Sequence, residues 1–381
     1  MQSDSNDLIF VYDLFGSFSR FNEAGYLSQF IDMFDYYSIY FDTIYAITYD
    51  NEIFDCFKRN CIHRPTMHNS KINNLALRRL KHFFFSGLSL PKKGKYVELV
   101  NTTTIIPAII CKLQRRRLFL YHRWSLRRML KEFGTPYSFL YYPAYLLDVL
   151  AFKLADTIAV ATPTLGLDAI KYAGYKKIFL LPNYVDTELF KPQNTETVNK
   201  LLIMVCRLHP QKNIPMVLEV MRYLPEFNLQ IIGDGPLKDE LIKLKNDNNL
   251  NNVQFIGTVP FESLPSYLNK AEAFVFPTLI EGHPKTLIEA MACGLPCICS
   301  NVEGIKEMII NGETGILCDL DVQSIKNAII NLFDDRAKMK CIGENAVKYV
   351  QRNYSKDVVL GRKVKLIKGE LDDIEPLFKK T

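Results

Sequence analysis

The stretch Glu281-Gly-His-Pro-Lys-Thr-Leu-Ile-Glu289-Ala-Met-Ala-Cys-Gly294-Leu-Pro296 is the most informative part of the chain. It predicts an acid at the end of a strand, then a short turn and a helix. Pro284 suits the first helical position, because the N–H that proline lacks would have no partner there in any case. Gly294 stands where a helix C-cap is expected, and Pro296 prevents the helix from continuing.

The same stretch carries candidate ligand-binding groups. The N–H groups of Lys285 and Thr286 would point out of the positive end of the predicted helix, which suits phosphate. Glu281 and Glu289 are eight positions apart, so that both carboxylates can face one ligand. From spacing alone, an ordinary strand–turn–helix unit with two solvated acids explains the pattern equally well.

Strands and helices alternate throughout the second half of the chain. The expected strands are Leu201–Val205, Leu229–Gly233, Val253–Gly257, Ala273–Pro277, Pro296–Ser300 and Gly315–Cys318. Besides the helix after Glu281, the expected helices are Ile214–Tyr223, Pro236–Asn246, Ser263–Asn269, Ile305–Ile310 and Val322–Phe333. Alternation of this kind predicts an α/β domain with a parallel sheet that is covered on both faces.

The first half has the same pattern in a less regular form. An apolar strand, Leu8–Tyr12, precedes a loop with Gly16, and a helical pattern runs from Glu23 to about Tyr37. The further expected strands are Thr43–Tyr49, Lys95–Asn101, Leu118–His122 and Ala155–Ala161, and the further helices are Asn69–Ser86, Thr102–Leu113, Pro143–Leu154, Pro163–Ala173 and Asp357–Glu370. Because 381 residues are too many for one core, two doubly wound domains are expected.

Composition places the chain among soluble globular proteins, with 48% hydrophobic and 23% charged residues. No apolar run is long enough to span a membrane, and the polar N-terminus predicts no signal peptide. Cys293, Cys297 and Cys299 cluster, but no matching His or Cys pair lies at zinc-like spacing to complete a site. We therefore expect free thiols, no metal site and a cytoplasmic protein that can also bind peripherally at a membrane surface.

The whole chain has a net charge of +6. The excess of basic residues is concentrated in Lys112–Lys131, which has eight Lys or Arg and no acid. Aromatic and aliphatic residues are mixed with these cations. A solvated face, a contact for anionic lipid or phosphate, and a nucleic-acid patch are three competing explanations. No nucleic-acid fold signature accompanies the run, so nucleic acid is not an expected partner.

Two loops in the second half suit a diphosphate. Arg207 and Lys212 lie five positions apart just after a predicted strand, where an Arg fork and a Lys point charge can bind one anion. Gly233 and Gly235 form a turn between a strand and a helix, and Gly257 ends the next strand. Exposed cations and plain turns are the alternative explanations.

Together these segments resemble the retaining GT-B glycosyltransferases of the "group 1" family, which use nucleotide sugars. Glu281–Glu289 resembles the Glu-x7-Glu signature of that family, and Arg207 with Lys212 resembles its Arg-x4-Lys pair. The segment Lys177–Pro192 is similar to the Pro-Asn-Gly-Val-Asp crossover segment, with Tyr184 at the glycine position. The resemblance is tight over residues 177–318, whereas the first 150 residues match only in layout.

The resemblance implies two facing Rossmann-like domains with a cleft between them. Residues 1–181 would form the acceptor domain and residues 182–355 the donor domain, and a helix in 356–381 would cross back onto the first domain. No metal is implied, because in that family cationic side chains can hold the diphosphate. The leaving phosphate would itself take the proton of the acceptor.

The resemblance also implies roles for individual residues. Glu281 would orient hydroxyls of the donor sugar, and Glu289 would hold the ribose hydroxyls. The implied catalytic residues are Glu281, Arg207, Lys212 and His122, and the implied donor-binding residues are Gly16, Gly233, Gly235, Gly257, His283, Pro284, Lys285, Thr286 and Glu289.

The expected activity is metal-independent transfer, with retention, of a hexosyl group from a UDP-, GDP- or ADP-sugar to a glycan or lipid-linked acceptor. No cofactor is expected beyond this nucleotide-sugar substrate. A sugar-nucleotide epimerase would instead release nucleotide-linked product without an acceptor. A catalytically weak subunit that stabilises a partner transferase would bind nucleotide tightly without turnover.

Overall fold

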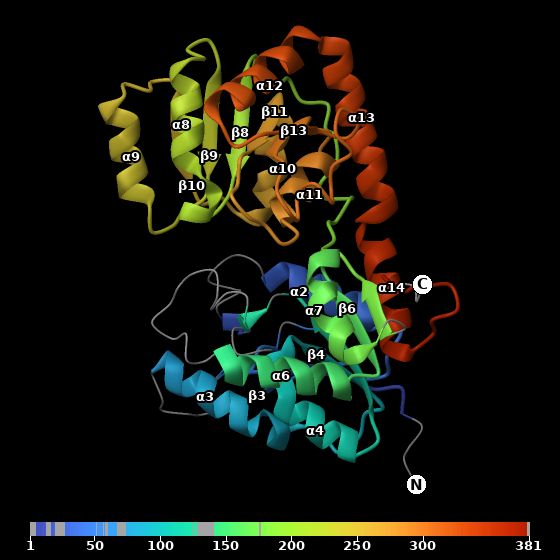
Figure 1. Cartoon of the computed structure of the whole chain (residues 1–381). Helices are drawn as coiled ribbons and strands as arrows, with labels where there is room; N and C mark the ends of the chain where they lie inside the picture. The colour runs from blue at the N-terminus through green and yellow to red at the C-terminus, as the bar shows by residue number, and fades with distance from the viewer. Residues whose placement is uncertain are drawn as a thin grey trace. The chain divides into compact units, whose positions relative to one another are not determined.

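The structure is a computed structural model, and it describes residues 5–12, 17–19, 27–50, 52–55, 57, 60–66, 74–123, 125–127, 141–174 and 177–378. The chain folds into two units, one of Met1–Leu181 with Leu360–Thr381 and the other of Pro182–Val359 (Figure 1). The chain therefore leaves the first unit once and returns to it near its C-terminus.

The first unit contains a parallel sheet of seven strands in the described part of the chain, in the order β3-β2-β1-β4-β5-β6-β7. These strands are β1 (Leu8–Val11), β2 (Ile44–Thr48), β3 (Cys61–Pro65), β4 (Tyr96–Val100), β5 (Arg117–His122), β6 (Thr157–Val160) and β7 (Ile178–Leu180). The strand order reverses between β1 and β4, and ligands of open α/β sheets bind at such a point.

Helices cover this sheet. They are α2 (Leu27–Tyr37), α3 (Leu75–Phe85), α4 (Ile105–Leu113), α6 (Tyr141–Leu154) and α7 (Pro163–Ala173), with short 3-10 helices η1 (Ser86–Ser89) and η2 (Thr102–Thr104). Apolar side chains of β1, β4, β5 and β6 form one core with α4, α6 and α7. The ends of α7 follow from its sequence, because Thr162 caps the N–H of Leu165, Pro163 begins the helix, and Gly174 ends it at a φ of +77°.

The last helix, α14 (Lys356–Lys368), begins in the second unit and continues in the first. Its Lys363 forms a buried ion pair with Glu98 of β4, with 2.6 Å between Nζ and Oε1. The Tyr37 hydroxyl donates a hydrogen bond to the other oxygen of Glu98 at 3.0 Å. Burial lowers the pKa of Lys363, and the charge of Glu98 counteracts part of that shift. This pair fixes the C-terminal helix to the sheet of the first unit.

The second unit contains a parallel six-stranded sheet in the order β10-β9-β8-β11-β12-β13. Its strands are β8 (Leu201–Val205), β9 (Asn228–Ile232), β10 (Val253–Gly257), β11 (Ala273–Phe276), β12 (Cys297–Ser300) and β13 (Ile316–Cys318). Its helices before α14 are α8 (Ile214–Arg222), α9 (Lys238–Asp247), α10 (Leu264–Lys270), α11 (Lys285–Ala292), α12 (Val322–Asp334) and α13 (Arg336–Asn353). Here the strand order reverses between β8 and β11.

The two chain segments that enter and leave the second unit lie side by side. Val185 pairs with Ser355, and the N–H of Lys356 donates to the carbonyl of Val185 at 2.9 Å. Lys356 also forms an ion pair with Asp186, with 2.5 Å between Nζ and Oδ2. These contacts keep the first turn of α14 with the second unit, which extends to Val359 rather than to residue 355.

The structure differs from the sequence predictions at four elements. Residues Ile305–Ile310 form turns and not the predicted helix, because six residues after Gly304, which has a φ of +82°, are too few for a stable helix. The strands β3 and β7 and the helix α13 were not predicted. None of the helices in the described ranges is both long and apolar enough to span a bilayer.

Candidate functional site

Two loops meet where the strand order of the second unit reverses. One follows β8 and carries Arg207 and Lys212, and the other follows β11 and carries Glu281. The Thr278 hydroxyl donates to the carbonyl of Gln211 at 3.0 Å, so the two loops are bonded through the backbone of the first. Because both loops follow parallel strands, they lie at the same edge of the sheet.

Lys212 and Glu281 form an ion pair across this point. The Thr278 hydroxyl also lies 2.9 Å from Oε1 of Glu281, the same oxygen that Lys212 contacts. Oε2 of Glu281 makes no hydrogen bond among the described residues, and Arg207 is exposed without a hydrogen-bond or ion-pair partner in that part of the chain. One carboxylate oxygen and one guanidinium are thus available to a ligand.

The glycine turn after β9 packs directly against the Arg207 loop. A Cβ at Gly233 would lie 1.9 Å from the carbonyl oxygen of Cys206, and one at Gly235 would lie 2.4 Å from that of Leu208. The N–H of Leu208 donates to the carbonyl of Asp234 at 3.0 Å. Only glycine permits this approach, so the turn positions the loop that carries the two cations.

Gly257 and Gly304 also lie in loops at the carboxyl edge of this sheet. The N–H of Gly233 donates to the carbonyl of Gly257 at 2.8 Å, which joins the ends of β9 and β10. A Cβ at Gly304 would lie 2.3 Å from the carbonyl oxygen of Glu281. The sequence analysis did not single out Gly304, and only the fold shows that its loop supports the turn at Glu281.

Helix α11 begins at Lys285, with Pro284 as its N-cap at a φ of −69° and a ψ of 123°. The prediction of Pro284 as the first helical residue is therefore wrong by one position, because its extended ψ keeps it outside the helix. No side chain caps this helix end, near which Thr286 lies half-buried. The ammonium of Lys285 lies 5.4 Å from the ring centroid of Tyr184, the residue at the glycine position of the crossover motif.

Glu289 lies inside α11 and is 5% exposed. Burial raises the pKa of its carboxyl to about 7, although the charge of Lys285 acts in the opposite direction. No hydrogen bond reaches the Glu289 carboxylate from the described residues. A buried acid of this kind is costly unless a ligand supplies the missing donors, so its burial and raised pKa are typical of a functional site.

His283 lies half-buried beside the crossover segment. Its ring centroid is 5.1 Å from that of Tyr354, and burial lowers the pKa of His283 to about 3. The side-chain amide of Asn183 donates to the His283 carbonyl at 2.5 Å. His283 therefore has a neutral ring that packs against an aromatic side chain, and its role in donor binding stays a prediction.

Residues 185–349 match the family Glycosyl transferases group 1. This region is a group 1 glycosyltransferase domain. For this region, the resemblance to the group 1 family that was inferred from the sequence is confirmed. Over 184 residues the chain is 34% identical to the UDP-Gal:alpha-D-GlcNAc-diphosphoundecaprenol alpha-1,3-galactosyltransferase of Escherichia coli, an alignment that covers 43% of this chain and 47% of that protein. The chain spans about half the length of the curated relatives it matches.

Solved structures match nearly the whole chain. Sucrose-phosphate synthase from Thermosynechococcus elongatus has a TM-score of 0.76 at 17% identity, over 96% of this chain and 99% of that one. HepE from Anabaena, in complex with UDP and glucose, has a TM-score of 0.72 at 17% identity, over 95% and 99%. The predicted GT-B fold, with two Rossmann-like units that each contain a parallel sheet, is confirmed.

Two predicted site residues belong to the other unit and not to the glycosyltransferase domain. His122 ends β5, where its side chain is 0% exposed and its ring centroid lies 5.1 Å from that of Phe152. Gly16 lies outside the described residues. The donor contacts of both residues remain predictions. Within the described ranges we find no group of three or more His, Cys, Asp or Glu side chains that could hold a metal ion.

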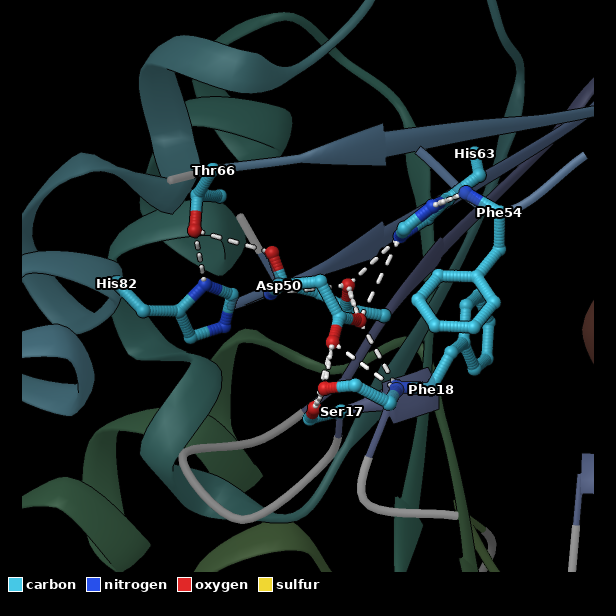
Figure 2. Close-up of polar contacts among 9 residues, drawn as sticks. Ser17, Phe18, Asp50, Phe54, His63, Thr66 and His82 are labelled. Atoms are coloured by element: carbon cyan, nitrogen blue, oxygen red, sulfur yellow. Dashed lines mark hydrogen bonds and ion pairs between the residues drawn. The ribbon is translucent and has the colours of Figure 1, made fainter. Parts of the chain in front are cut away.

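The sequence analysis missed a buried polar network at the carboxyl ends of β1 to β3 in the first unit (Figure 2). Asp50, just after β2, accepts hydrogen bonds from the Ser17 hydroxyl at 2.5 Å, the Phe18 N–H at 2.8 Å and the Thr48 hydroxyl at 2.6 Å. Burial raises the pKa of Asp50, but these hydrogen bonds outweigh it, and the net shift is downward. Asp50 therefore holds the segment that follows the β1 loop.

Two histidines complete the network. The Phe54 N–H donates to Nδ1 of His63 at 3.0 Å, so the ring proton of a neutral His63 is on Nε2, which lies 2.8 Å from the Thr48 hydroxyl. Nε2 of His82, on α3, lies 3.1 Å from the carbonyl oxygen of Tyr12 and donates to it. Burial lowers the pKa of each histidine to about 4.

His82→Gln is expected to lower the free energy of unfolding at pH 7.5, and this deficit should shrink by about 2–3 kcal/mol at pH 4.5. His82 takes up its proton near pH 6.5 in the unfolded chain but near pH 4 in the folded protein. Between these values the unfolded state binds more protons, so the contribution of His82 to stability is lost as the pH falls. Urea denaturation of both proteins at the two pH values measures the difference.

The comparison with wild type is necessary because other groups titrate in the opposite direction. Burial raises the pKa of Asp148 to about 6, which favours the folded state on acidification. His209→Gln serves as the control, because His209 lies outside the network, immediately before the 3-10 turn after β8. A deficit of His82→Gln that stays constant from pH 7.5 to pH 4.5 would contradict a neutral, buried His82.

Proposed function

We propose that this chain is a retaining, metal-independent glycosyltransferase that moves a sugar from a nucleotide-diphospho-sugar to a glycan or lipid-linked acceptor. The observation that carries the proposal is the ion pair of Lys212 with Glu281 at the strand reversal of the glycosyltransferase domain. The exposed Arg207 and the uncapped start of α11 belong to the same domain. The fourth component is Glu289, a buried acid without a hydrogen-bond donor among the described residues.

These groups match the charges of the reaction. Breaking the sugar–phosphate bond puts negative charge on the leaving diphosphate and leaves an oxocarbenium-like sugar. Arg207, Lys212 and the backbone amides at the start of α11 can stabilise the diphosphate without reorganisation. The unbonded oxygen of Glu281 can accept a hydroxyl of the donor sugar, and Glu289 can accept the ribose hydroxyls. In this scheme the leaving phosphate takes the acceptor proton, so no separate base is assigned.

UDP-sugars are the first donors to test. The Escherichia coli relative is named for UDP-Gal and for an acceptor on diphosphoundecaprenol, and HepE was solved with UDP and glucose. GDP- and ADP-sugars remain alternatives, and so does a glycan acceptor. The peripheral membrane contact that the sequence analysis placed in Lys112–Lys131 also remains a proposal, and the structure changes which residues would make it.

A thermal-shift and hydrolysis panel of UDP-, GDP- and ADP-sugars, with and without EDTA, tests the proposal. We expect one nucleotide to raise the melting temperature and its sugar to be hydrolysed slowly despite EDTA. Glu289→Gln should remain folded, because it removes a costly buried charge, but it should bind that nucleotide about tenfold or more weakly. The anomeric configuration of the transferred sugar, read by NMR, tests retention.

Each competing function has its own signature in the same panel. Release of an epimerised nucleotide sugar without an acceptor would indicate an epimerase. Tight binding with no hydrolysis or transfer would indicate a subunit that stabilises another transferase. Loss of turnover in EDTA would refute metal independence, and no thermal shift with any nucleotide would refute the assignment of the donor site.

A further inference from the structure

One helical face of the first unit exposes an unusual share of large hydrophobic side chains. Twenty such residues are exposed in the described part of the chain, and half of them lie on α3, η1, α4 and α6. They are Leu77, Leu80, Phe84, Phe85, Leu88, Ile109, Leu113, Tyr142, Leu146 and Leu150, which we call the apolar face. Monomeric soluble proteins rarely expose contiguous apolar patches without an interaction that uses them.

The elements that carry the apolar face are neighbours. Helix α4 packs against both α6 and η1, and η1 continues directly from α3 (Figure 1). A Cβ at Gly87 would lie 2.3 Å from the side chain of Ile110, which shows how closely η1 approaches α4. On α6, Tyr142, Leu146 and Leu150 are four positions apart and so form one stripe. The exposed residues therefore make one surface and not isolated points.

The charges around the apolar face have one sign. Between Asn74 and Arg116 the chain has nine Lys or Arg and a single acid, Glu98, which is 0% exposed. Lys92, Lys93 and Arg115 are exposed. On α6 the only acid, Asp148, is buried. A surface with exposed apolar groups and cations but no exposed carboxylate of its own matches an anionic lipid interface.

A basic cavity opens at the C-terminal end of α4, beside the apolar face. It has a volume of about 400 Å³ and is lined by Lys112, Arg115, Arg116, Arg117 and Asp156. Nη1 of Arg116 and Nε of Arg117 are buried and lack a hydrogen-bond partner in the described ranges. Asp156 compensates one cation, since it pairs with Lys112 at 2.6 Å. Nη2 of Arg116 donates to the carbonyls of Pro91 and Lys92, and Nη2 of Arg117 donates to the Thr157 hydroxyl, so the exposed cations that can meet the phosphate of a lipid headgroup here are Lys112 and Arg115.

We propose that the apolar face docks the first unit onto an anionic membrane surface. The apolar side chains would enter the interface, while Lys92, Lys93 and Arg115 contact headgroup phosphates. A hydrophobic protein partner would account for the apolar residues but not for the absence of exposed acids. This binding goes beyond the proposed sugar transfer, because it uses the first unit alone and needs no nucleotide.

The docking surface differs from the basic run that the sequence analysis singled out. Only the start of Lys112–Lys131 borders the apolar face. Further along, Arg117 donates to the Thr157 hydroxyl at 2.9 Å, Arg123 to the Tyr12 hydroxyl at 3.4 Å, and Arg127 pairs with Asp168 at 2.8 Å. Trp124, Arg128 and Lys131 lie outside the described residues.

Vesicle co-sedimentation with the full chain tests the proposal. We expect binding to an equimolar mixture of phosphatidylcholine and phosphatidylglycerol, weakened by salt, and little binding to phosphatidylcholine alone. Leu88→Ser with Leu113→Ser removes the two most exposed leucines of the face, at 76% and 80% exposure. Lys92→Glu with Lys93→Glu reverses two charges. Each double variant should bind about tenfold or more weakly, because it removes apolar groups or cations that hold the face at a lipid surface.

Controls of the same kind lie in the second unit. Val198→Ser removes an exposed apolar side chain, and Lys338→Glu with Lys340→Glu reverses two exposed charges. The controls should bind vesicles as wild type does. If the wild type shows a nucleotide-induced thermal shift, all variants should keep it. The thermal shift tests the donor site and the vesicle binding tests the docking surface, so a failure of one proposal is distinguished from a failure of the other.

Three outcomes would overturn the proposal. The first is no binding to anionic vesicles, and the second is equal weakening by the controls and the face variants. The third is a stoichiometric protein complex that forms without lipid and that the face variants abolish, because this would assign the face to a protein partner.

Discussion

Arg207→Ala is expected to reduce kcat by about 100-fold or more while the free energy of unfolding changes by less than about 0.5 kcal/mol. The guanidinium is exposed and has no partner among the described residues, so its removal disturbs no internal contact. In the proposed reaction it stabilises charge that develops on the leaving diphosphate, and that stabilisation is lost. Steady-state kinetics with the donor found in the panel, together with urea denaturation, separates the two effects.

Arg222→Ala is the matched control for this experiment. Arg222 is also exposed in the glycosyltransferase domain, on α8, where it pairs with Glu219 at 2.8 Å. It should keep wild-type turnover and stability. Lys212→Ala should also lower kcat, but it removes the partner of a largely buried Glu281 and so should reduce stability as well. Wild-type turnover of Arg207→Ala would refute the assignment of the diphosphate site.

Lys363→Met is expected to lower the free energy of unfolding by about 3–5 kcal/mol, because it leaves the carboxylate of Glu98 buried without its counter-charge. Glu98 is 0% exposed and Lys363 nearly so. The double variant Glu98→Leu with Lys363→Met should recover much of this loss, since it removes both charges at once. Urea denaturation followed by near-UV circular dichroism measures all three proteins.

Lys365→Met is the control on the same helix. Lys365 pairs with Asp373 at 3.2 Å, but both side chains are exposed, so the change should cost about 0–1 kcal/mol. Equal losses for Lys363→Met and Lys365→Met would show that the buried pair has no special role. No recovery in the double variant would show that apolar packing, rather than charge, holds α14 at this point.

Much of the glycosyltransferase domain could be predicted from its sequence, because each element carries a local signal. The strands β8 and β10 have the predicted bounds, since β8 is an apolar run, β10 is mostly apolar, and polar turns precede both. The helix α7 also has its predicted bounds, because Pro163 and Gly174 mark its ends. Elements of this kind are specified by neighbouring residues alone.

Elements without a local signal were missed. The strand β3 has the sequence Cys-Ile-His-Arg-Pro, which lacks an apolar alternation and ends in proline. It is a strand because its backbone pairs with β2, a segment more than ten residues earlier. The polar network of His63 and Asp50 was missed for the same reason, because its members meet only after these two strands pair.

The residues of the candidate site could be predicted from the sequence, but the contacts between their side chains could not. The sequence places Arg207, Lys212 and Glu281 at carboxyl ends of strands, and parallel strands bring such ends together. It does not show that Lys212 and Glu281 are paired with each other while Arg207 stays unbonded. Those states depend on side-chain geometry, and so does the raised pKa of Glu289, which follows from its burial.

The return of the chain to its first unit has a consequence for biosynthesis. A ribosome that has finished Leu181 must still make the whole second unit before Lys363 exists, which takes on the order of 10–40 s at bacterial and eukaryotic elongation rates. Throughout that interval the nascent first unit has Glu98 but no cation to neutralise it, and the site for α14 is uncovered. The newly made protein is therefore most vulnerable to aggregation and most dependent on chaperones just before its last helix emerges.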